Sequence, residues 1–434
     1  MKNNISIIIL AAGKGSRMKS SLPKVLHKIS GFEMLYYSIK EASKLSDDIH
    51  VVLYHQADLV KSTMEKYFSN VNFTIQDHEN YPGTGGAVMG IDLKHENTLV
   101  LNGDMPLIQS VELEKFLDFP NSAIVMSVLD LNDASGYGRV IIENNKVVKI
   151  VEQKDCNQTQ LEVKIANAGI YSFSTKFLND NLSKLSNDNA QEEYYITDLV
   201  EIAINTNLEV SPLVVDEENF KGVNSKYDLA AAEVLHQNRI KKEFMTAGVI
   251  MRMPDSIYIE ASVIIEGESI IENNVTLLGD TKIINSHIKT SSVVEDSTLE
   301  DSDIGPMARV RPNSNLKNTH LGNFVEVKKS TLSGVKAGHL AYIGDSEVQS
   351  GTNIGAGVIT CNYDGINKYK TTIGKNVFIG SDSQLIAPLN IEDDTMIAAG
   401  STVTSDVKSG ELYITRAKAK AIKGFFYKFF KTNK

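Results

Sequence analysis

The spacing of apolar residues divides the chain into two halves with different patterns. Up to about residue 224, short apolar runs of strand length alternate with segments whose apolar residues recur at helical spacing. We predict strands at residues 5–10, 49–54, 98–101, 123–129 and 147–151, and helices at 33–45 and 58–68. This alternation favours an α/β fold with a mostly parallel sheet, in which ligands bind at the carboxyl ends of the strands.

After a helix predicted at residues 225–245, the apolar pattern acquires a period of six. Two series of aliphatic residues show it: Ile259, Ile265, Ile271, Leu277 and Ile283, then Ile373, Ile379, Leu385, Ile391, Ile397 and Val403. A period of six fits neither a helix nor an alternating strand, and it indicates a parallel β-helix in which each hexad forms one side of a coil. Three hexads per coil predict about nine coils over residues 250–410.

One interruption of the repeat predicts a projecting loop. Ile354 and Ile373 are nineteen positions apart, where a full coil of three hexads would take eighteen. The residues Asn362-Tyr363-Asp364-Gly365 lie between them and have the composition of a turn. Because loops on rigid scaffolds often carry function, we expect this one to take part in a site.

His339 lies near this loop in the sequence. A lone histidine more often has a structural role than a catalytic one. Here the repeat around it is regular, and the cations Arg311, Lys328 and Lys329 precede it. We therefore regard His339 as a candidate general base for an amine nucleophile.

The first predicted strand leads into a candidate nucleotide-binding loop, Ala11–Gly15, followed by the cations Arg17 and Lys24. Glycines let backbone N–H groups approach phosphate oxygens closely. The loop lacks the third glycine of the dinucleotide motif and no Walker pattern follows, so the glycines alone are a weak signal. The two cations strengthen it, because a triphosphate needs positive charge around it.

Three further residues fit a nucleotide and metal site. Gly83 belongs to a second glycine-rich turn, suited to close contact with a base or ribose. Asp104 follows an apolar run, where its carboxylate is a natural Mg²⁺ ligand, although a turn-forming role is equally consistent. Asn224 offers an amide oxygen that could complete the metal site.

Composition excludes several classes of protein. The 434 residues suffice for two or more domains, and the net charge of −10 argues against general nucleic-acid binding. Two cysteines without metal-ligand spacing argue against zinc and against a disulfide framework. No apolar run approaches the roughly 20 residues that span a bilayer, so no integral membrane segment is expected. Without an N-terminal signal pattern, we expect a cytoplasmic protein.

We expect four segments: a first domain at 1–224, a linker helix at 225–245, a β-helix domain at 246–417 and a tail at 418–434. The tail combines six lysines with five aromatic residues. Our preferred interpretation is a helix packed across the open end of the solenoid. The alternative is a basic, aromatic surface helix that contacts a membrane.

The motifs of both halves resemble those of the bacterial bifunctional N-acetylglucosamine-1-phosphate uridyltransferase/glucosamine-1-phosphate acetyltransferase family. The resemblance covers nearly all of residues 3–417, through LAAGKGSRM, GTGGA, NGDMPL, GYGR, NAGI, GVN, RVRP, NFVEVKKS, KAGHLAYIGD, NIGAGVITCNYDG and IGSDSQLIAP. It implies a Rossmann-like nucleotidyltransferase domain followed by a left-handed β-helix, although connections between parallel strands are usually right-handed.

The resemblance also implies substrates and partners. These are Mg²⁺, the co-substrates UTP and acetyl-CoA, the sugar phosphates glucosamine 1-phosphate and N-acetylglucosamine 1-phosphate, and a homotrimer with acetyl sites shared between subunits. The implied product is UDP-N-acetylglucosamine, for peptidoglycan and lipopolysaccharide synthesis.

In the first half the resemblance implies a UTP and UDP-N-acetylglucosamine site at Leu10, Ala11, Ala12, Gly13, Lys24, Gln76, Gly83, Thr84, Asn102, Gly103, Asp104, Gly138, Glu152, Asn167 and Asn224. Asp104 and Asn224 would hold Mg²⁺, and the catalytic cations would be Arg17 and Lys24. In the second half it implies sugar-phosphate contacts at Arg311, Lys328, Tyr342, Asn353 and Lys368, with His339 as the base. Acetyl-CoA contacts would be Ala356, Asn362, Tyr363, Ser381, Ala399 and Arg416.

Two alternatives stay open. Relative to the family, two residues are inserted before Gly83, so that either Gln76 or His78 contacts the base. The whole chain could also be a single-function sugar-phosphate nucleotidyltransferase whose β-helix only assembles or regulates it. His339, the lysine cluster and the loop at Asn362–Gly365 favour two active sites, because a scaffold has no need of them.

Overall fold

The computed structural model describes residues 4–431 except 136, 152, 154, 155 and 190. The chain forms two compact units, residues 1–236 and 237–434. The division falls inside helix α9 (Lys226–Thr246), which corresponds to the linker helix expected at 225–245. Each unit is considered by itself below.

The first unit is built on a sheet whose central strands run parallel. The order is β11 (Val210–Val214), β7 (Ile124–Asp130), β10 (Ile165–Ser174), β6 (Asn97–Asn102), β1 (Ile5–Leu10), β4 (Asp48–Leu53) and β5 (Asn72–Ile75). Strand β10 is antiparallel to both neighbours. The predicted strand at 147–151 lies in β9 (Lys146–Val151), which forms an antiparallel hairpin with β8 (Arg139–Glu143). The mostly parallel α/β sheet is thus confirmed.

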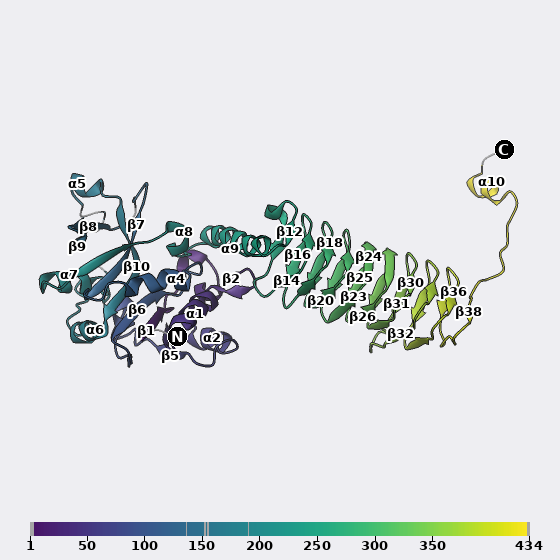
Figure 1. Cartoon of the computed structure of the whole chain (residues 1–434), viewed down its shortest axis with the longest axis horizontal. Helices are drawn as coiled ribbons and strands as arrows, with labels where there is room; N and C mark the ends of the chain where they lie inside the picture. Colours follow the sequence, from purple (N-terminus) through teal and green to yellow (C-terminus); the bar gives the residue numbers. More distant parts are fainter. Residues whose placement is uncertain (1–3, 136, 152, 154–155, 190, 432–434) are drawn as a thin grey trace. The chain divides into compact units, whose positions relative to one another are not determined.

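Helices cover both faces of this sheet (Figure 1). Ile7 and Ile9 of β1 pack in one core with apolar residues of α1 (Met34–Leu45) and α2 (Ala57–Met64). Ile8 faces the other way and packs with residues of α6 (Thr175–Leu182) and α7 (Asp198–Asn205). Because successive strand residues alternate faces, an apolar run is needed where both faces are covered. The helix predicted at 58–68 ends earlier than expected, at Met64.

Short elements complete the first unit. They are β2 (Lys28–Ile29), β3 (Phe32–Glu33), α3 (Gly83–Gly86), α4 (Ser110–Glu114), α5 (Gln158–Leu161) and α8 (Glu217–Phe220).

The second unit is the predicted β-helix, with three parallel sheets that we call faces 1, 2 and 3. Face 1 contains β12 (Ile250–Met251), β15 (Ile270–Ile271), β18 (His287–Ile288), β21 (Asp303–Ile304), β24 (His320–Asn323), β27 (Lys336–His339), β30 (Asn353–Ile354), β33 (Phe378–Ile379), β36 (Met396–Ile397) and β38 (Leu412–Tyr413). Face 2 contains β13 (Tyr258–Ile259), β16 (Thr276–Leu278), β19 (Val293–Glu295), β22 (Arg309–Arg311), β25 (Glu326–Lys328), β28 (Tyr342–Gly344), β31 (Ile359–Cys361), β34 (Gln384–Ile386) and β37 (Thr402–Val403). Face 3 contains β14 (Ile264–Glu266), β17 (Lys282–Ile284), β20 (Ser297–Glu300), β23 (Ser314–Lys317), β26 (Thr331–Ser333), β29 (Ser346–Val348), β32 (Thr371–Ile373) and β35 (Leu389–Ile391).

The hexad residues point into the solenoid. Ile259, Ile271 and Leu277 are completely buried, as are Ile373 and Ile379 farther along. Each stacks in parallel register on the equivalent residue of the next coil, for example Ile259 on Leu277. This arrangement confirms the parallel β-helix and is consistent with the left-handed form.

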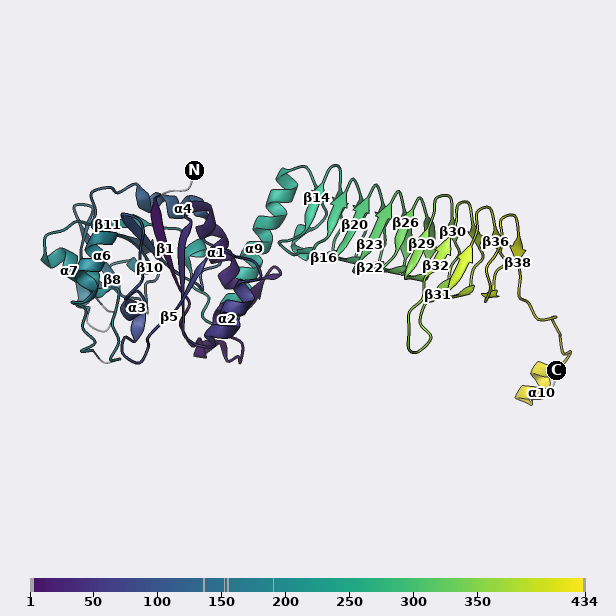
Figure 2. The same cartoon turned by 90° about the horizontal axis from the view of Figure 1, so that it is seen from below.

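The break in the repeat is larger than the sequence interval suggested. Ile354 lies on face 1, the next inward residue, Thr360, lies on face 2, and Ile373 lies on face 3. Two sides need twelve positions, so the nineteen observed contain seven extra residues; the comparison with a full coil of eighteen was wrong. The extra residues form a projecting loop after β31, held by an antiparallel bridge between Tyr363 and Lys368 (Figure 2).

The tail does not pack across the open end of the solenoid, contrary to our preferred interpretation. Every residue from 417 to 431 is exposed, including the short helix α10 (Phe425–Phe430). Val407, which is completely buried, and Tyr413 already pack against the core of the last coils, so the tail helix has no part in covering it. Among the described residues, no helix is long and apolar enough to cross a membrane.

Candidate functional site

The nucleotide-binding loop lies where two parallel strands of the first unit end side by side. Leu10, the last residue of β1, is the register partner of Asn102, the last residue of β6. The N–H of Gly103 donates to the carbonyl of Leu10 over 2.9 Å. Asp104 follows directly, so the loop and this carboxylate share the carboxyl edge of the sheet, where ligands of such folds bind.

The loop offers unpaired amides. Within the described part of the chain, nothing accepts a hydrogen bond from the backbone N–H of Ala12, Gly13 or Lys14. Gly15 has a φ of +62°, and a Cβ there would lie 2.5 Å from the Cβ of Lys24. Glycine at this position is therefore required for Lys24 to lie against the loop. Free amides next to a cation form a suitable cradle for phosphate oxygens.

Four predicted residues from distant parts of the sequence meet at one point. The ammonium group of Lys24 forms an ion pair with Asp104 and donates to Asn224 Oδ1 over 2.8 Å. Arg17 donates to the same oxygen, also over 2.8 Å. Lys24 and Asp104 are largely buried, with side chains 13% and 20% exposed. The structure thus brings the predicted metal ligands and catalytic cations together.

Asp228 positions Asn224, and the sequence interpretation missed it. Its carboxylate accepts hydrogen bonds from the backbone N–H groups of Asn224 and Ser225 and from the Ser225 hydroxyl. Burial alone would raise the pKa of Asp228, but these hydrogen bonds hold it below its ordinary value. The signal was present as Ser-x-x-Asp ahead of a helix, the pattern of a capping box.

Two hollows meet at Asp104. One, of about 290 Å³, is lined by predicted nucleotide residues, namely Leu10, Ala11, Ala12, Gly13, Lys24, Gln76, Gly83, Thr84, Asn102 and Asp104. The other, of about 420 Å³, is lined by Arg17, Asn102, Asp104, Asn167 and Asn224 among others. Such a pair can hold a nucleotide and a second phosphate compound in neighbouring hollows that share Asn102 and Asp104.

Both candidates for the base contact line the first hollow. The side-chain NH₂ of Gln76 donates to the carbonyls of Tyr81 and Gly83, each over 2.9 Å, so Gln76 shapes the glycine-rich turn. The His78 ring packs on the ring of Tyr54, with centroids 4.3 Å apart. Since Gln76 and His78 both line the hollow, either one can reach a base.

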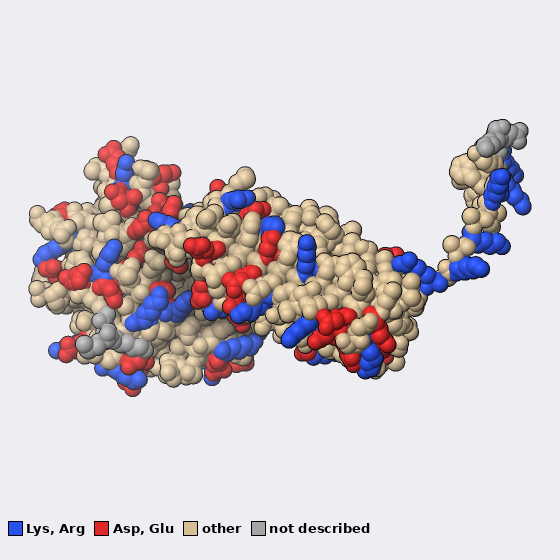
Figure 3. All heavy atoms as spheres, turned by 45° about the vertical axis from the view of Figure 1, so that its right-hand side comes forward, with Lys and Arg blue, Asp and Glu red and all other residues tan. Residues whose placement is uncertain are grey.

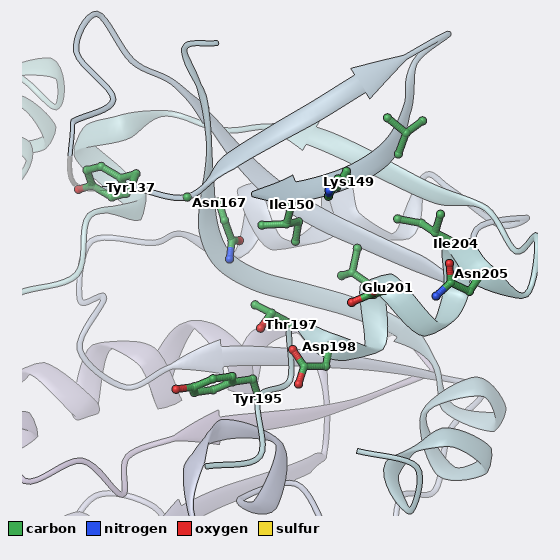
Figure 4. Close-up of a pocket in the computed structure, with 13 residues that line it drawn as sticks. Tyr137, Lys149, Ile150, Asn167, Tyr195, Thr197, Asp198, Glu201, Ile204 and Asn205 are labelled. Atoms are coloured by element: carbon green, nitrogen blue, oxygen red, sulfur yellow. The ribbon is translucent and has the colours of Figure 1, made fainter. Parts of the chain in front are cut away.

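A third hollow, of about 560 Å³, lies beside the predicted sugar contacts Gly138 and Asn167. Figure 4 shows Asn167 on one side of it and Tyr195, Thr197 and Asp198 on the other. Burial, with a smaller effect of the nearby Glu201, raises the pKa of Asp198. No motif predicted this wall, because it depends on where residues 195–198 lie relative to β9 and β10, which supply other lining residues of the hollow. Glu152, a further predicted sugar contact, lies outside the described residues.

On the β-helix, cations gather on face 2. Arg311 and Lys328 are register partners on β22 and β25. The ammonium of Lys368, from the projecting loop, and to a smaller degree burial and Arg311, lower the pKa of Lys328. Crowded cations of this kind favour an anionic ligand. Tyr342 begins the next strand of the same face, whereas Asn353 lies on face 1 and does not join this group.

The candidate base and three predicted acetyl-CoA contacts form a ladder along the corner between faces 1 and 2. His339, Ala356, Ser381 and Ala399 each stand two residues after an inward residue of face 1. The coils touch closely here, since a Cβ on Gly380 would lie 2.4 Å from the nitrogen of Ala399. His339 is exposed at this corner, where a ligand can reach it.

The remaining predicted acetyl-CoA contacts lie at two different corners, one on each side of face 2. Arg416 joins the corner ladder, its Nη2 donating to the carbonyl of Ala399 over 3.1 Å. Asn362 and Tyr363 follow β31 at the opposite corner, where Asn362 donates to Asp345 over 2.6 Å. A strand of three residues spans roughly 10 Å, so the two groups cannot contact the same atoms within one chain.

The comparisons with known proteins agree with this architecture. The model of the nucleotidyl transferase family matches residues 6–218, so the first unit is a nucleotidyltransferase domain. "Bifunctional protein GlmU" of Aliarcobacter butzleri is 72% identical over 99% of both chains. The proteins of the same name from a Nitratiruptor species and from Wolinella succinogenes are 57% and 58% identical, over 99% of this chain and 100% of their own length.

The chain therefore belongs to the GlmU family of bifunctional proteins. The single-function alternative loses support, because relatives that carry the bifunctional name match the β-helix as well as the first unit.

Proposed function

We propose that the protein makes UDP-N-acetylglucosamine in two steps, N-acetylation of glucosamine 1-phosphate by acetyl-CoA and then uridylyl transfer from UTP. The observation that carries the proposal is the presence of two separate sites. The cluster of Lys24, Asp104 and Asn224 lies in the first unit, and the crowded cations of face 2 lie in the second, as does His339.

In the first step the sugar amine attacks the thioester carbonyl of acetyl-CoA. A C–N bond forms, the C–S bond breaks and the thiol of CoA leaves. His339 accepts the proton that the amine loses. Arg311, Lys328 and Lys368 hold the sugar phosphate, so that catalysis rests mainly on positioning and proton transfer.

In the second step a phosphate oxygen of N-acetylglucosamine 1-phosphate attacks the α-phosphorus of UTP, and the bond to pyrophosphate breaks. The amides of the loop at Ala12–Lys14 receive phosphate oxygens, while Arg17 and Lys24 neutralise the charge that develops. The two hollows that meet at Asp104 can hold the two reacting phosphates next to each other, for an attack in line with the leaving pyrophosphate. No covalent intermediate with the enzyme is needed.

Mg²⁺ fits the residues present. Asp104 and Asn224 offer a carboxylate and an amide oxygen, the hard donors that Mg²⁺ prefers; in the structure Lys24 forms an ion pair with the first and donates to the second. A bound ion would supply positive charge to the phosphates of UTP.

The experiment that tests the proposal follows both products at once. The protein is incubated with glucosamine 1-phosphate, acetyl-CoA and UTP, and free thiol and pyrophosphate are measured separately. We expect thiol release first and pyrophosphate after it. Pyrophosphate from supplied N-acetylglucosamine 1-phosphate without any thiol release would favour the scaffold interpretation of the β-helix instead.

We further propose a homotrimer in the cytoplasm, with each acetyl site shared between subunits. The separation of the predicted acetyl-CoA residues on the two corners of face 2 supports the sharing of sites between subunits. Co-expression of a His339→Ala chain with a Tyr363→Ala chain should restore thiol release, because some sites then receive both intact corners. A His339→Ala chain paired with Ser381→Arg, at the same corner, is the control and should restore nothing; equal behaviour of the two pairs argues against shared sites.

A further inference from the structure

Lys221 lies beside the metal and phosphate residues of the first unit, although it belongs to no motif. It follows α8, whose last residue Phe220 is 2% exposed, and it precedes Gly222 and Val223 of the GVN motif. The N–H of Val223 donates to the carbonyl of Asp104 over 2.9 Å. A Cβ on Gly222 would lie 3.5 Å from Asp104 Oδ1. The buried residues on each side therefore hold the backbone of Lys221 close to Asp104.

The charge of the larger hollow at Asp104, of about 420 Å³, depends on Lys221. We call this hollow the acceptor hollow; its lining includes two cations, Arg17 and Lys221, and two carboxylates, Asp104 and Asp228. Asp104 pairs with Lys24, and Asp228 is occupied by its capping hydrogen bonds. Without Lys221 the lining would present two carboxylates against one cation, which disfavours a phosphate. Figure 3 shows positive and negative side chains mixed over the visible face of the first unit, so anion binding here depends on individual cations.

The ammonium group of Lys221 is available to a ligand. Lys221 is exposed, and it takes part in no ion pair within the part of the chain that the structure describes. Glu217 and Glu218 of α8 line a neighbouring hollow of about 280 Å³ together with Lys221, without an ion pair to it among the described residues. Burial raises the pKa of Asp228, hydrogen bonds lower it, and Lys221 adds only a smaller lowering. No carboxylate therefore competes strongly for this cation.

We propose that Lys221 binds the phosphate of N-acetylglucosamine 1-phosphate in the acceptor hollow, beside Arg17. This assignment rests on the proposed uridylyl transfer, in which one phosphate approaches the triphosphate of UTP against the repulsion of like charges. Lys24 lines the nucleotide hollow, whereas Arg17 and Lys221 line the acceptor hollow. Each reacting phosphate thus has cations of its own, and the long side chain of Lys221 can follow the phosphate as it moves.

The test measures pyrophosphate release by the full chain while each substrate is varied in turn. Lys221→Gln should raise the KM for N-acetylglucosamine 1-phosphate about three- to tenfold, as expected for one partly exposed, charge-assisted contact. The kcat, the KM for UTP and the Tm should stay close to the wild-type values, because the ammonium holds the substrate equally in the ground state and the transition state. Lys221→Arg should restore the KM. The KM of the wild type should rise more steeply with salt than that of Lys221→Gln.

The matched control is Lys226→Gln, which removes an exposed lysine at the start of α9 that does not line the acceptor hollow. It should leave the KM for N-acetylglucosamine 1-phosphate unchanged. An equal rise in both variants would assign the effect to the general charge of the protein and overturn the inference. A lower Tm in Lys221→Gln, with a KM that Lys221→Arg does not restore, would overturn it in favour of a structural role.

Calorimetric titration with N-acetylglucosamine 1-phosphate makes the same comparison without turnover. We expect the Kd of Lys221→Gln to be about three- to tenfold higher than that of the wild type. Equal Kd values for the two proteins overturn the role of Lys221 and leave the proposed function standing. Weaker binding by Lys221→Gln, with no pyrophosphate release from the wild type, supports Lys221 as a phosphate contact and counts against the proposed function alone.

Discussion

Replacing Asp104 by Asn should separate the two activities. The substitution keeps the size and shape of the side chain and removes its charge. In the structure this carboxylate forms an ion pair with Lys24, which also donates to Asn224 Oδ1 over 2.8 Å; after the change an amide oxygen can still accept from Lys24, but the opposite charge is gone. The lost pair is largely buried, so water compensates for it poorly.

The magnitude follows from these contacts. A charge-assisted hydrogen bond contributes about 1.5–3 kcal/mol, so the free energy of unfolding of the first unit should fall by about that amount at most. A preorganised electrostatic group at a transition state typically accounts for about 10²–10³ in kcat. We therefore expect pyrophosphate release to slow about 10²–10³-fold. Acetyl transfer should not change, because its residues lie in the other compact unit.

The assay measures thiol and pyrophosphate release on the same preparation, with thermal unfolding as a check on folding. The control is Asp92→Asn, which changes a carboxylate of the same unit away from the cluster and should leave both rates unchanged. A parallel loss of both activities in Asp104→Asn would refute the two-site model. Pyrophosphate release close to the wild-type rate would refute the role given to Asp104.

Three further predictions concern the other sites. His339→Ala should abolish thiol release and leave pyrophosphate release from supplied N-acetylglucosamine 1-phosphate intact; an unchanged thiol rate would remove His339 as the base. The positive charge of Lys328 is lost as pH rises through its pKa, which Lys368 lowers, so kcat/KM for glucosamine 1-phosphate should fall at high pH. In Lys368→Gln the fall in kcat/KM should begin at a higher pH. A fall that begins at a lower pH would contradict the statement that Lys368 lowers the pKa of Lys328. Gln76→Ala should raise the KM for UTP and lower the Tm by a few degrees, because two hydrogen bonds to the glycine-rich turn are lost. His78→Ala should raise the KM for UTP without changing the Tm. An unchanged KM in either variant would exclude that residue from the base contact.

Much of the fold was predictable because its rules are local. In a β-helix every coil presents the same environment, so residues such as Ile259 and Leu277 repeat at the interval that the stack imposes. The strand at residues 5–10 was predictable for a related reason, since only an apolar run can be buried on both faces of a sheet. The family motifs then indicated the chemical role of residues for which composition alone left the role ambiguous.

The distances between functional groups were not predictable in this way. Asp104 and Asn224 are far apart in the sequence, and only the sheet and the capping box at Asp228 bring them to Lys24. The wall at Thr197 and Asp198 carried no motif because its role depends on the element it packs against.

The sequence by itself determined the two folds, the family and the residue types at each site, because these depend on periodicity and on short motifs. Only the tertiary structure decided the size of the inserted loop, the exposure of the tail helix and the separation of Asn362 from Ala399. The size of the loop and the separation of Asn362 from Ala399 depend on which corner of the solenoid each residue reaches. The exposure of the tail helix depends on whether the last coils leave an apolar surface to cover. A linear interval cannot reveal this, because nineteen positions can be read either as one coil plus one residue or as two sides plus seven.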